Sequence, residues 1–190
     1  MSKGMLVVLS APSGCGKDTV FNKICSIRDD VVKSVSATTR KPREGEQEGV
    51  NYYYVTKEQF EDMIENNLLL EYASYNNCYY GTPVKGVEKA IEDGKICFLI
   101  IEVQGAQRVK ELFPDCLSIF LLPPSEKELE KRLRSRESDE DDVIIKRLDI
   151  AKVELAFKEK YDYQIINDDL NDCVNNINKI LTSELKKRLA

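Results

Sequence analysis

Short apolar runs alternate with amphipathic segments along most of the chain. The runs are dense in β-branched or large apolar residues, which is typical of strands buried in a parallel sheet. They lie at residues 5–9, 95–101, 117–122 and 163–166. Segments with helical periodicity lie between and after them, at residues 19–27, 83–92, 104–112 and from about 169. This order predicts an α/β fold in which helices cover both faces of a parallel sheet.

Two stretches depart from this alternation. Residues 34–83 are rich in Thr, Tyr, Arg and Glu and show strand-like alternation at 51–56, which predicts a small mixed α/β insert. Residues 125–160 have a helical pattern and are heavily charged, which predicts a helical lid. The predicted core is formed by the remaining segments, residues 1–33, 84–124 and 161–190.

The composition limits both the chemistry and the partners. The chain has 190 residues and a net charge of −5, and 42% of its residues are hydrophobic, which suits one compact domain with inserted parts. The acidic balance gives no overall attraction to nucleic acid or to an anionic membrane, so we expect neither as a partner. The sequence indicates no obligate protein partner. Histidine is absent, which excludes histidine-based nucleophile activation and leaves Lys, Arg, carboxylates, hydroxyls and metal ions for catalysis.

The cysteines and the N-terminus indicate the compartment. The six cysteines form no C-x-x-C pair and lie in apolar segments, which favours free thiols in a reducing compartment over a disulfide framework. The apolar run near the N-terminus is too short for a signal peptide or a membrane span. We therefore expect a cytoplasmic protein.

The sharpest motif is SAPSGCGKDT, which directly follows the first predicted strand and precedes the first predicted helix. It nearly matches the phosphate-binding pattern G-x-x-x-x-G-K-[ST], with Ala11 at the first glycine and Asp18 at the last position. Gly14 and Gly16 let the backbone curl and turn its N–H groups inward, and Lys17 adds a mobile positive charge. The alternative is a glycine-rich turn with an incidental lysine, but the strand before the motif and the helix after it favour a phosphate loop.

A second group of anion-binding residues lies in the insert, within SVSATTRKPREGE, NYYY and LLLEYASYNNCYYGT. Arg40 and Arg43 flank Pro42, whose ring stiffens the presentation of two guanidinium groups, and such groups suit phosphate oxygens. Tyr52 and Tyr80 can donate hydroxyls to the same anion. A surface covered with ion pairs is the alternative, but scattered lysines are typical of such a surface. The clustering therefore predicts a second anion site.

Taken together, these motifs resemble those of the guanylate kinase family. The resemblance runs from about Met5 to the C-terminal helix and includes the further motifs EVQGAQ, LPPS with ELxxRLxxR, and YDYxIxNDDL. It implies a P-loop NTPase-type kinase core with a GMP-binding insert and a lid. It also implies ATP-dependent phosphorylation of GMP, and of dGMP, with Mg²⁺ as cofactor.

The resemblance also implies the site residues. Those implied to bind GMP are Ser36, Arg40, Arg43, Glu46, Tyr52, Glu71, Tyr80, Thr82 and Glu102. Those implied to bind ATP are Ser13, Gly14, Cys15, Gly16, Lys17, Asp18, Thr19, Arg136 and Asn167. The residues implied to stabilise the transferring group are Lys17, Arg43, Arg136 and Arg147. The chemistry suits guanine, because its N1–H and N2–H₂ donors match carboxylates and its O6 and N7 acceptors match hydroxyls.

Three positions depart from the family pattern, and one of them, Glu137, replaces the glycine usual after the lid arginine. Asp18 stands where phosphate-loop enzymes often carry the hydroxyl that ligates Mg²⁺, and Ile100 stands where guanylate kinases commonly carry an aspartate. We hypothesise that Asp18 holds Mg²⁺ in place of that aspartate. The competing interpretation is that Asp18 only stabilises the positive end of the helix and that Ile100 is ordinary core.

Three alternatives remain open. One is a kinase of the same fold for another phosphorylated acceptor, such as ribose 1,5-bisphosphate, although a sugar phosphate needs no residues that read guanine. Another is a non-catalytic guanylate-kinase-like binding domain, although Lys17 and the loop glycines are intact. The third concerns Cys15, whose place near a helix N-terminus favours alkylation, whereas its apolar surroundings favour packing.

Overall fold

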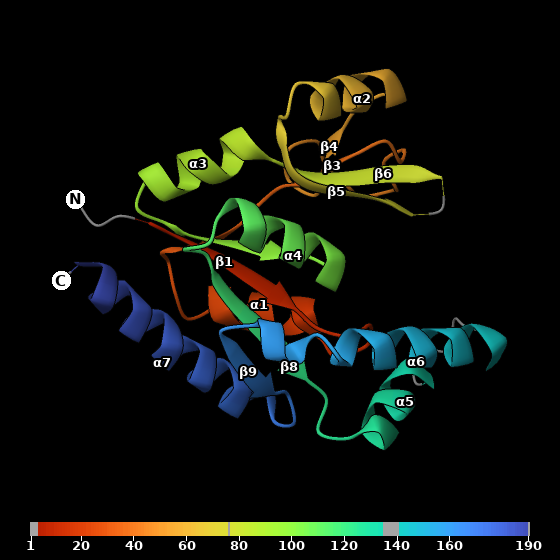
Figure 1. The fold of residues 1–190 in the computed structure, drawn as a ribbon, viewed down its shortest axis with the longest axis vertical. Helices are drawn as coiled ribbons and strands as arrows, with labels where there is room; N and C mark the ends of the chain where they lie inside the picture. Colours follow the sequence, from red (N-terminus) through yellow and green to blue (C-terminus); the bar gives the residue numbers. More distant parts are fainter. Residues whose placement is uncertain (1–3, 76, 135–140, 190) are drawn as a thin grey trace.

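The central sheet consists of five parallel strands in the order β2-β7-β1-β8-β9 (Figure 1). Our computed structural model describes residues 4–75, 77–134 and 141–189. The strands span Met5–Ser10 (β1), Val31–Lys33 (β2), Ile96–Ile100 (β7), Leu117–Leu122 (β8) and Tyr163–Ile166 (β9). Every residue of β1 is buried, because β1 lies at the centre of the sheet and both faces are covered. The four apolar runs in the sequence therefore are strands, as predicted.

Helices cover both faces of this sheet. They span Lys17–Cys25 (α1), Val84–Glu92 (α3), Val103–Leu112 (α4) and Leu170–Leu189 (α7). The side chains of β1 alternate between two cores: Met5, Val7 and Leu9 pack with α1 and α7, whereas Leu6 and Val8 pack with α3 and α4. The predicted α/β fold is confirmed.

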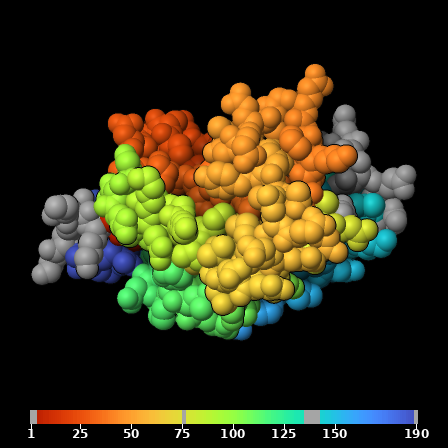
Figure 2. Space-filling view, turned by 90° about the horizontal axis from the view of Figure 1, so that it is seen from above, coloured from red at the N-terminus to blue at the C-terminus, as the bar shows by residue number. Residues whose placement is uncertain are grey.

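The insert forms a second, four-stranded sheet in the order β4-β3-β6-β5. Its elements span Ala37–Thr38 (β3), Tyr53–Tyr54 (β4), Lys57–Glu65 (α2), Leu69–Tyr75 (β5) and Cys78–Pro83 (β6). Viewed from above, the orange and yellow surface of the insert lies beside the yellow-green α3 and the green α4 (Figure 2). Strand β4 is shorter than the alternation at 51–56 predicted, because Thr56 caps α2 in a reciprocal capping box with Gln59.

The charged region after β8 is helical, as its pattern predicted. It contains α5 (Glu126–Arg134), α6 (Asp141–Leu155) and a short 3₁₀ helix at Lys158–Lys160. Leu129 and Leu133 of α5 and Ile144 and Ala151 of α6 are buried in the core that also contains α1 and α7. Within the described ranges, no helix combines the length and the apolar character needed to cross a bilayer.

Candidate active site

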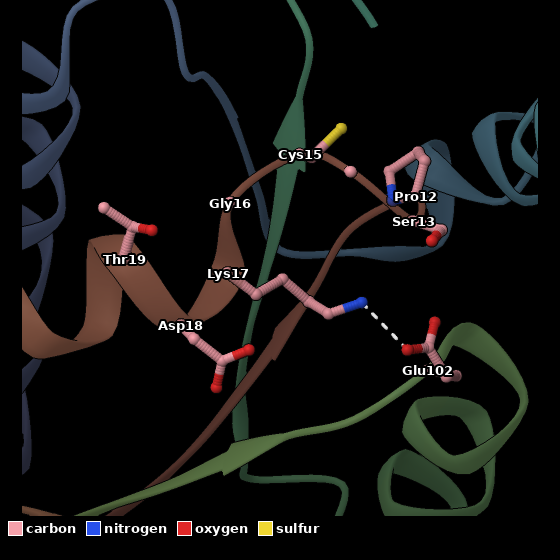
Figure 3. Close-up of a pocket in the computed structure, with 9 residues that line it drawn as sticks. Pro12, Ser13, Cys15, Gly16, Lys17, Asp18, Thr19 and Glu102 are labelled. Carbon is pink, nitrogen blue, oxygen red and sulfur yellow. Dashed lines mark hydrogen bonds and ion pairs between the residues drawn. The ribbon is translucent and has the colours of Figure 1, made fainter. Parts of the chain in front are cut away.

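The phosphate loop connects β1 to α1 and curves around a cavity of about 200 Å³ (Figure 3). The cavity is lined by Pro12, Ser13, Gly14, Cys15, Gly16, Lys17, Asp18, Thr19 and Glu102. Gly14 and Gly16 have φ angles of 91° and 81°, which side chains with a Cβ rarely adopt. The sequence therefore predicted the loop and its glycines correctly, and the loop ends where the N-terminus of α1 begins.

Three residues from distant parts of the chain hold the phosphate loop in place. The Asn167 side-chain amide donates a 2.7 Å hydrogen bond to the Cys15 carbonyl, and Arg132 donates to the Asn167 carbonyl at 3.0 Å. A Cβ on Gly14 would lie 2.8 Å from Leu133 of α5. The resemblance implied ATP contact for Asn167, whereas its side chain here holds the loop and the residue is only 7% exposed. Arg132, which lies within the motif ELxxRLxxR, was not among the site residues predicted from the sequence.

The Cys15 thiol is an internal packing group. The residue is fully buried in the core, and burial raises its thiol pKa to about 11, although Lys17 and Arg132 lower it in part. Because the thiolate is the reactive form, this environment disfavours alkylation. Of the two interpretations of Cys15, the structure supports packing.

Lys17 is held in place at the cavity wall. Its ammonium group donates to the Ala11 carbonyl at 2.9 Å. It also donates to Glu102 Oε1 at 3.0 Å (Figure 3). The lysine side chain is only 12% exposed, whereas that of Glu102 is 65% exposed. Glu102 is the N-cap residue of α4, so the end of β7 places its carboxylate beside the loop. The resemblance implied a guanine contact for Glu102, whereas in the structure its carboxylate pairs with Lys17.

Helix α6 brings a further carboxylate, that of Glu154, close to Glu102 and Lys17. Burial, and after it the neighbouring Glu102, raises the pKa of Glu154 to about 7, although Lys17 lowers it in part. Its Oε2 atom is buried without a hydrogen-bond partner among the described residues. No motif in the sequence pointed to Glu154, because a single glutamate in a charged helix carries no distinguishing pattern.

Asp18 and Thr19 follow Lys17 in the first turn of α1. The Asp18 carboxylate is exposed and accepts from Lys33 of β2 at 3.2 Å. The Thr19 side chain points away from Lys17 in Figure 3, as expected from two helical steps of about 100° each. Ile100 is partly buried and packs against the core.

A magnesium site built entirely from protein groups is not found in the described ranges, because no group of three or more acidic, histidine or cysteine side chains converges there. Mg²⁺ in nucleotide kinases usually keeps waters and takes phosphate oxygens, so it needs only one or two carboxylates. The exposed Asp18 carboxylate at the rim of the cavity fits that requirement.

In the insert, a carboxylate orients one of the predicted arginines. Arg40 donates two hydrogen bonds to Glu46, at 3.0 and 2.8 Å. Glu46 also accepts from the Arg43 backbone N–H at 2.7 Å and from the Tyr54 hydroxyl at 2.8 Å. These bonds, the Arg40 pair first among them, lower the pKa of Glu46 to about 2. The Arg43 side chain is exposed, and Tyr54 was not singled out from the sequence.

Aromatic rings complete this cluster. The Arg40 guanidinium lies 5.3 Å from the centre of the Tyr52 ring, which lies 6.0 Å from that of Tyr80. The sequence predicted one anion site formed by Arg40, Arg43, Tyr52 and Tyr80, and the resemblance added Glu46. The structure brings Arg40, Tyr52, Tyr80 and Glu46 together, whereas Arg43 joins them through its backbone N–H. Because Glu46 is ionised and paired with Arg40, it positions the guanidinium and is not itself an anion ligand.

A buried carboxylate lies next to this cluster, on β5. Glu71 is 8% exposed, and its Oε1 accepts a 2.6 Å hydrogen bond from the Thr82 hydroxyl on β6. Burial raises the pKa of Glu71, and the Thr82 hydrogen bond lowers it. Ser36, directly before β3, is half-buried, and its carbonyl accepts from the Tyr53 N–H. The Glu71 carboxylate is thus fixed in place, and it can still accept further hydrogen bonds from a ligand.

The remaining predicted residues belong to the lid. Arg147 lies on α6 and is half-buried, with partners of its own. Arg136 and Glu137 lie outside the described residues.

Comparison with known proteins agrees with this geometry. The guanylate kinase family model matches residues 3–184. The guanylate kinase of Shouchella clausii is 49% identical over 186 residues, which cover 98% of this chain and 91% of that protein. That of Halalkalibacterium halodurans is 48% identical with the same coverage. The crystal structure of guanylate kinase from Anaplasma phagocytophilum matches with a TM-score of 0.75 and 36% identity, covering 97% of this chain and 88% of that one. The chain therefore belongs to the guanylate kinase family.

Proposed function

We propose that this member of the guanylate kinase family transfers the γ-phosphoryl group of ATP to GMP, and to dGMP, by in-line displacement in the cytoplasm. ATP-dependent phosphorylation of GMP follows from the family to which the chain belongs. The cytoplasm is supported by six cysteines that are all free thiols. The observation that carries the proposal is that the buried Glu71–Thr82 pair lies beside the pair of Arg40 and Glu46. The first pair offers groups for a purine base, and the second offers a guanidinium for its phosphate.

The donor side rests on the phosphate loop. Its left-handed glycines and the N-terminus of α1 offer backbone N–H groups and a positive helix end to the phosphates of ATP. Lys17 neutralises charge that develops on the transferring group, and the lid arginines Arg136 and Arg147 add to this as the lid closes. Glu102 keeps the Lys17 ammonium at the cavity wall.

The acceptor side rests on the insert. Arg40 and Arg43 hold the GMP phosphate together with the hydroxyls of Tyr52 and Tyr80. Glu46 fixes the fork of the Arg40 guanidinium, so that it is already oriented before the phosphate arrives.

The base is read by buried polar groups. The Glu71 carboxylate accepts from N1–H and N2–H₂ of guanine, and the Ser36 hydroxyl donates to one of the guanine acceptors. The Thr82 hydroxyl donates its single proton to Glu71 and so holds that carboxylate in place. Adenine offers an acceptor at N1, which would face Glu71 without a proton between them. The buried site therefore selects against adenine, because it would leave two acceptors unpaired.

We further propose that Asp18 holds the Mg²⁺ that accompanies ATP. The metal supplies positive charge that offsets the charge on the β- and γ-phosphates. Turnover and Mg²⁺ dependence should be measured for Asp18→Ser, Ile100→Asp and the double variant. We expect Asp18→Ser to need more Mg²⁺ for half-maximal rate and the double variant to recover; near-normal behaviour of Asp18→Ser alone would refute this role.

The proposal is tested by ADP release with ATP and a panel of acceptors: GMP, dGMP, AMP, UMP and ribose 1,5-bisphosphate. We expect GMP and dGMP to be phosphorylated far faster than the others. Preference for ribose 1,5-bisphosphate would indicate the sugar-phosphate kinase instead. A non-catalytic binding domain would show no ADP release and no ATP-dependent rise in melting temperature.

A further inference from the structure

Gly105 occupies a helical position where its own backbone does not require glycine. It is the third residue of α4, and its φ is not among the left-handed values that mark the loop glycines. Glycine is among the least favourable residues inside a helix, because it loses the most backbone freedom on folding. Its presence there therefore calls for a cause outside α4.

The cause lies in the carboxylate of Glu71. Helix α4 packs against β5, the strand that carries Glu71. A Cβ on Gly105 would lie 2.8 Å from Glu71 Oε2, 3.3 Å from Cδ and 3.5 Å from Cγ. These three nearest atoms all belong to one side chain. An alanine at 105 would thus meet Glu71 before any other residue, and relief of this contact requires the carboxylate to move.

The other carboxylate oxygen limits where Glu71 can go. Its Oε1 is held at 2.6 Å by the Thr82 hydroxyl, and the residue is only 8% exposed. A rotation that takes Oε2 away from Gly105 therefore disturbs the Thr82 hydrogen bond or turns the plane of the carboxylate. The first turn of α4 also carries partial positive charge, which favours a carboxylate at this short distance.

We propose that Gly105 is a positioning residue for base recognition: the missing side chain lets the Glu71 carboxylate lie against α4 in the orientation that reads the N1–H and N2–H₂ edge of guanine. This inference rests on the proposed function, in which Glu71 reads the base. Gly105 itself touches no substrate. Its contribution is to the affinity for GMP and to the discrimination between GMP and IMP, which lacks the N2 amino group.

The test compares Gly105→Ala with a matched control, Gly86→Ala. Gly86 is an exposed glycine in α3, and no atom lies within 4 Å of the position of its Cβ. In Gly105→Ala we expect KM for GMP to rise by about tenfold, the scale of one disturbed charge-assisted hydrogen bond. The preference for GMP over IMP should fall, while KM for ATP stays within about twofold. Gly86→Ala should change none of these quantities.

A double-mutant cycle shows whether Gly105 acts through Glu71. In the Glu71→Gln background the alanine at 105 should add little to KM for GMP, since the carboxylate is already lost. Additive effects would contradict the proposal. If Gly105→Ala does not fold, the double variant Gly105→Ala/Glu71→Asp should recover a native melting transition, because the shorter side chain withdraws from α4; failure to recover would equally contradict it.

The outcomes separate this inference from the function beneath it. Absence of GMP phosphorylation by the wild type would overturn the proposed function. A Glu71→Gln variant with unchanged KM for GMP would remove Glu71 from base recognition and this inference with it. Unchanged KM for GMP in a folded Gly105→Ala variant would overturn this inference alone.

Discussion

Replacing Glu154 with glutamine should stabilise the protein in a manner that depends on pH. The pKa of Glu154 is raised from its ordinary value of 4.5 to about 7, chiefly by burial and then by Glu102. A carboxyl group with a raised native pKa binds its proton more tightly in the folded state than in the unfolded state. Stability is therefore lost as the pH rises from about 4.5 to about 7, and the loss is complete above that range.

The magnitude follows from the same values. A pKa of about 7 instead of 4.5 corresponds to about 3 kcal/mol, at about 1.36 kcal/mol per pKa unit. Glu154 is only half-buried, so solvent reduces this figure, and we expect an effect on the order of 1–2 kcal/mol. Glutamine is neutral at every pH in this range, so the variant does not lose this stability as the pH rises.

Urea denaturation at pH 5 and at pH 8 measures the difference. The free energy of unfolding of Glu154→Gln minus that of the wild type should grow by about 1–2 kcal/mol between the two pH values. Glu88→Gln, which alters an exposed carboxylate on α3, serves as the control and should follow the wild type. If the Glu154→Gln and wild-type profiles run parallel across this range, the environment assigned to Glu154 is wrong.

Three further predictions concern the loop and the insert. Glu46→Gln should raise KM for GMP by about tenfold with less change in kcat, because Arg40 loses its charged partner. An unchanged KM for GMP in steady-state assays would contradict the role of Glu46 in orienting Arg40. Asn167→Ala should lower the free energy of unfolding by about 1–3 kcal/mol, since the buried Cys15 carbonyl loses its donor, and equal denaturation midpoints would contradict this. Peptide mapping after iodoacetamide treatment should find Cys15 modified only in denaturant; rapid modification of the native protein would show that the thiol is accessible.

The parts of the fold that the sequence predicted are those with a strong local pattern. Residues Met5–Leu9 could be recognised as a strand because burial on both faces makes every position apolar. The phosphate loop could be recognised because its backbone needs glycine at fixed spacing. By contrast, β2 has three residues and β3 has two, which is too short for any periodicity. The alternation at 51–56 indicated a strand where β4 lies, but it did not reveal that this strand has only two residues.

The contacts that the sequence could not predict join residues that are far apart in the chain. Asn167 supports Cys15 across 152 positions, and nothing local to either residue specifies the partner. The approach of Glu71 to Gly105 depends on how the insert packs against α4. In both cases tertiary packing decides which partner a polar side chain meets. The family resemblance placed Asn167 and Glu71 in the nucleotide sites, but it did not predict these contacts.

The most direct test of the account follows the phosphoryl group itself, from ATP labelled at the γ-position to an equimolar mixture of GMP and AMP. Chromatography of the products should show label in GDP and almost none in ADP, because the buried Glu71 rejects adenine while Lys17 and the loop accept ATP. Label divided equally between GDP and ADP, or no labelled diphosphate, would contradict the account.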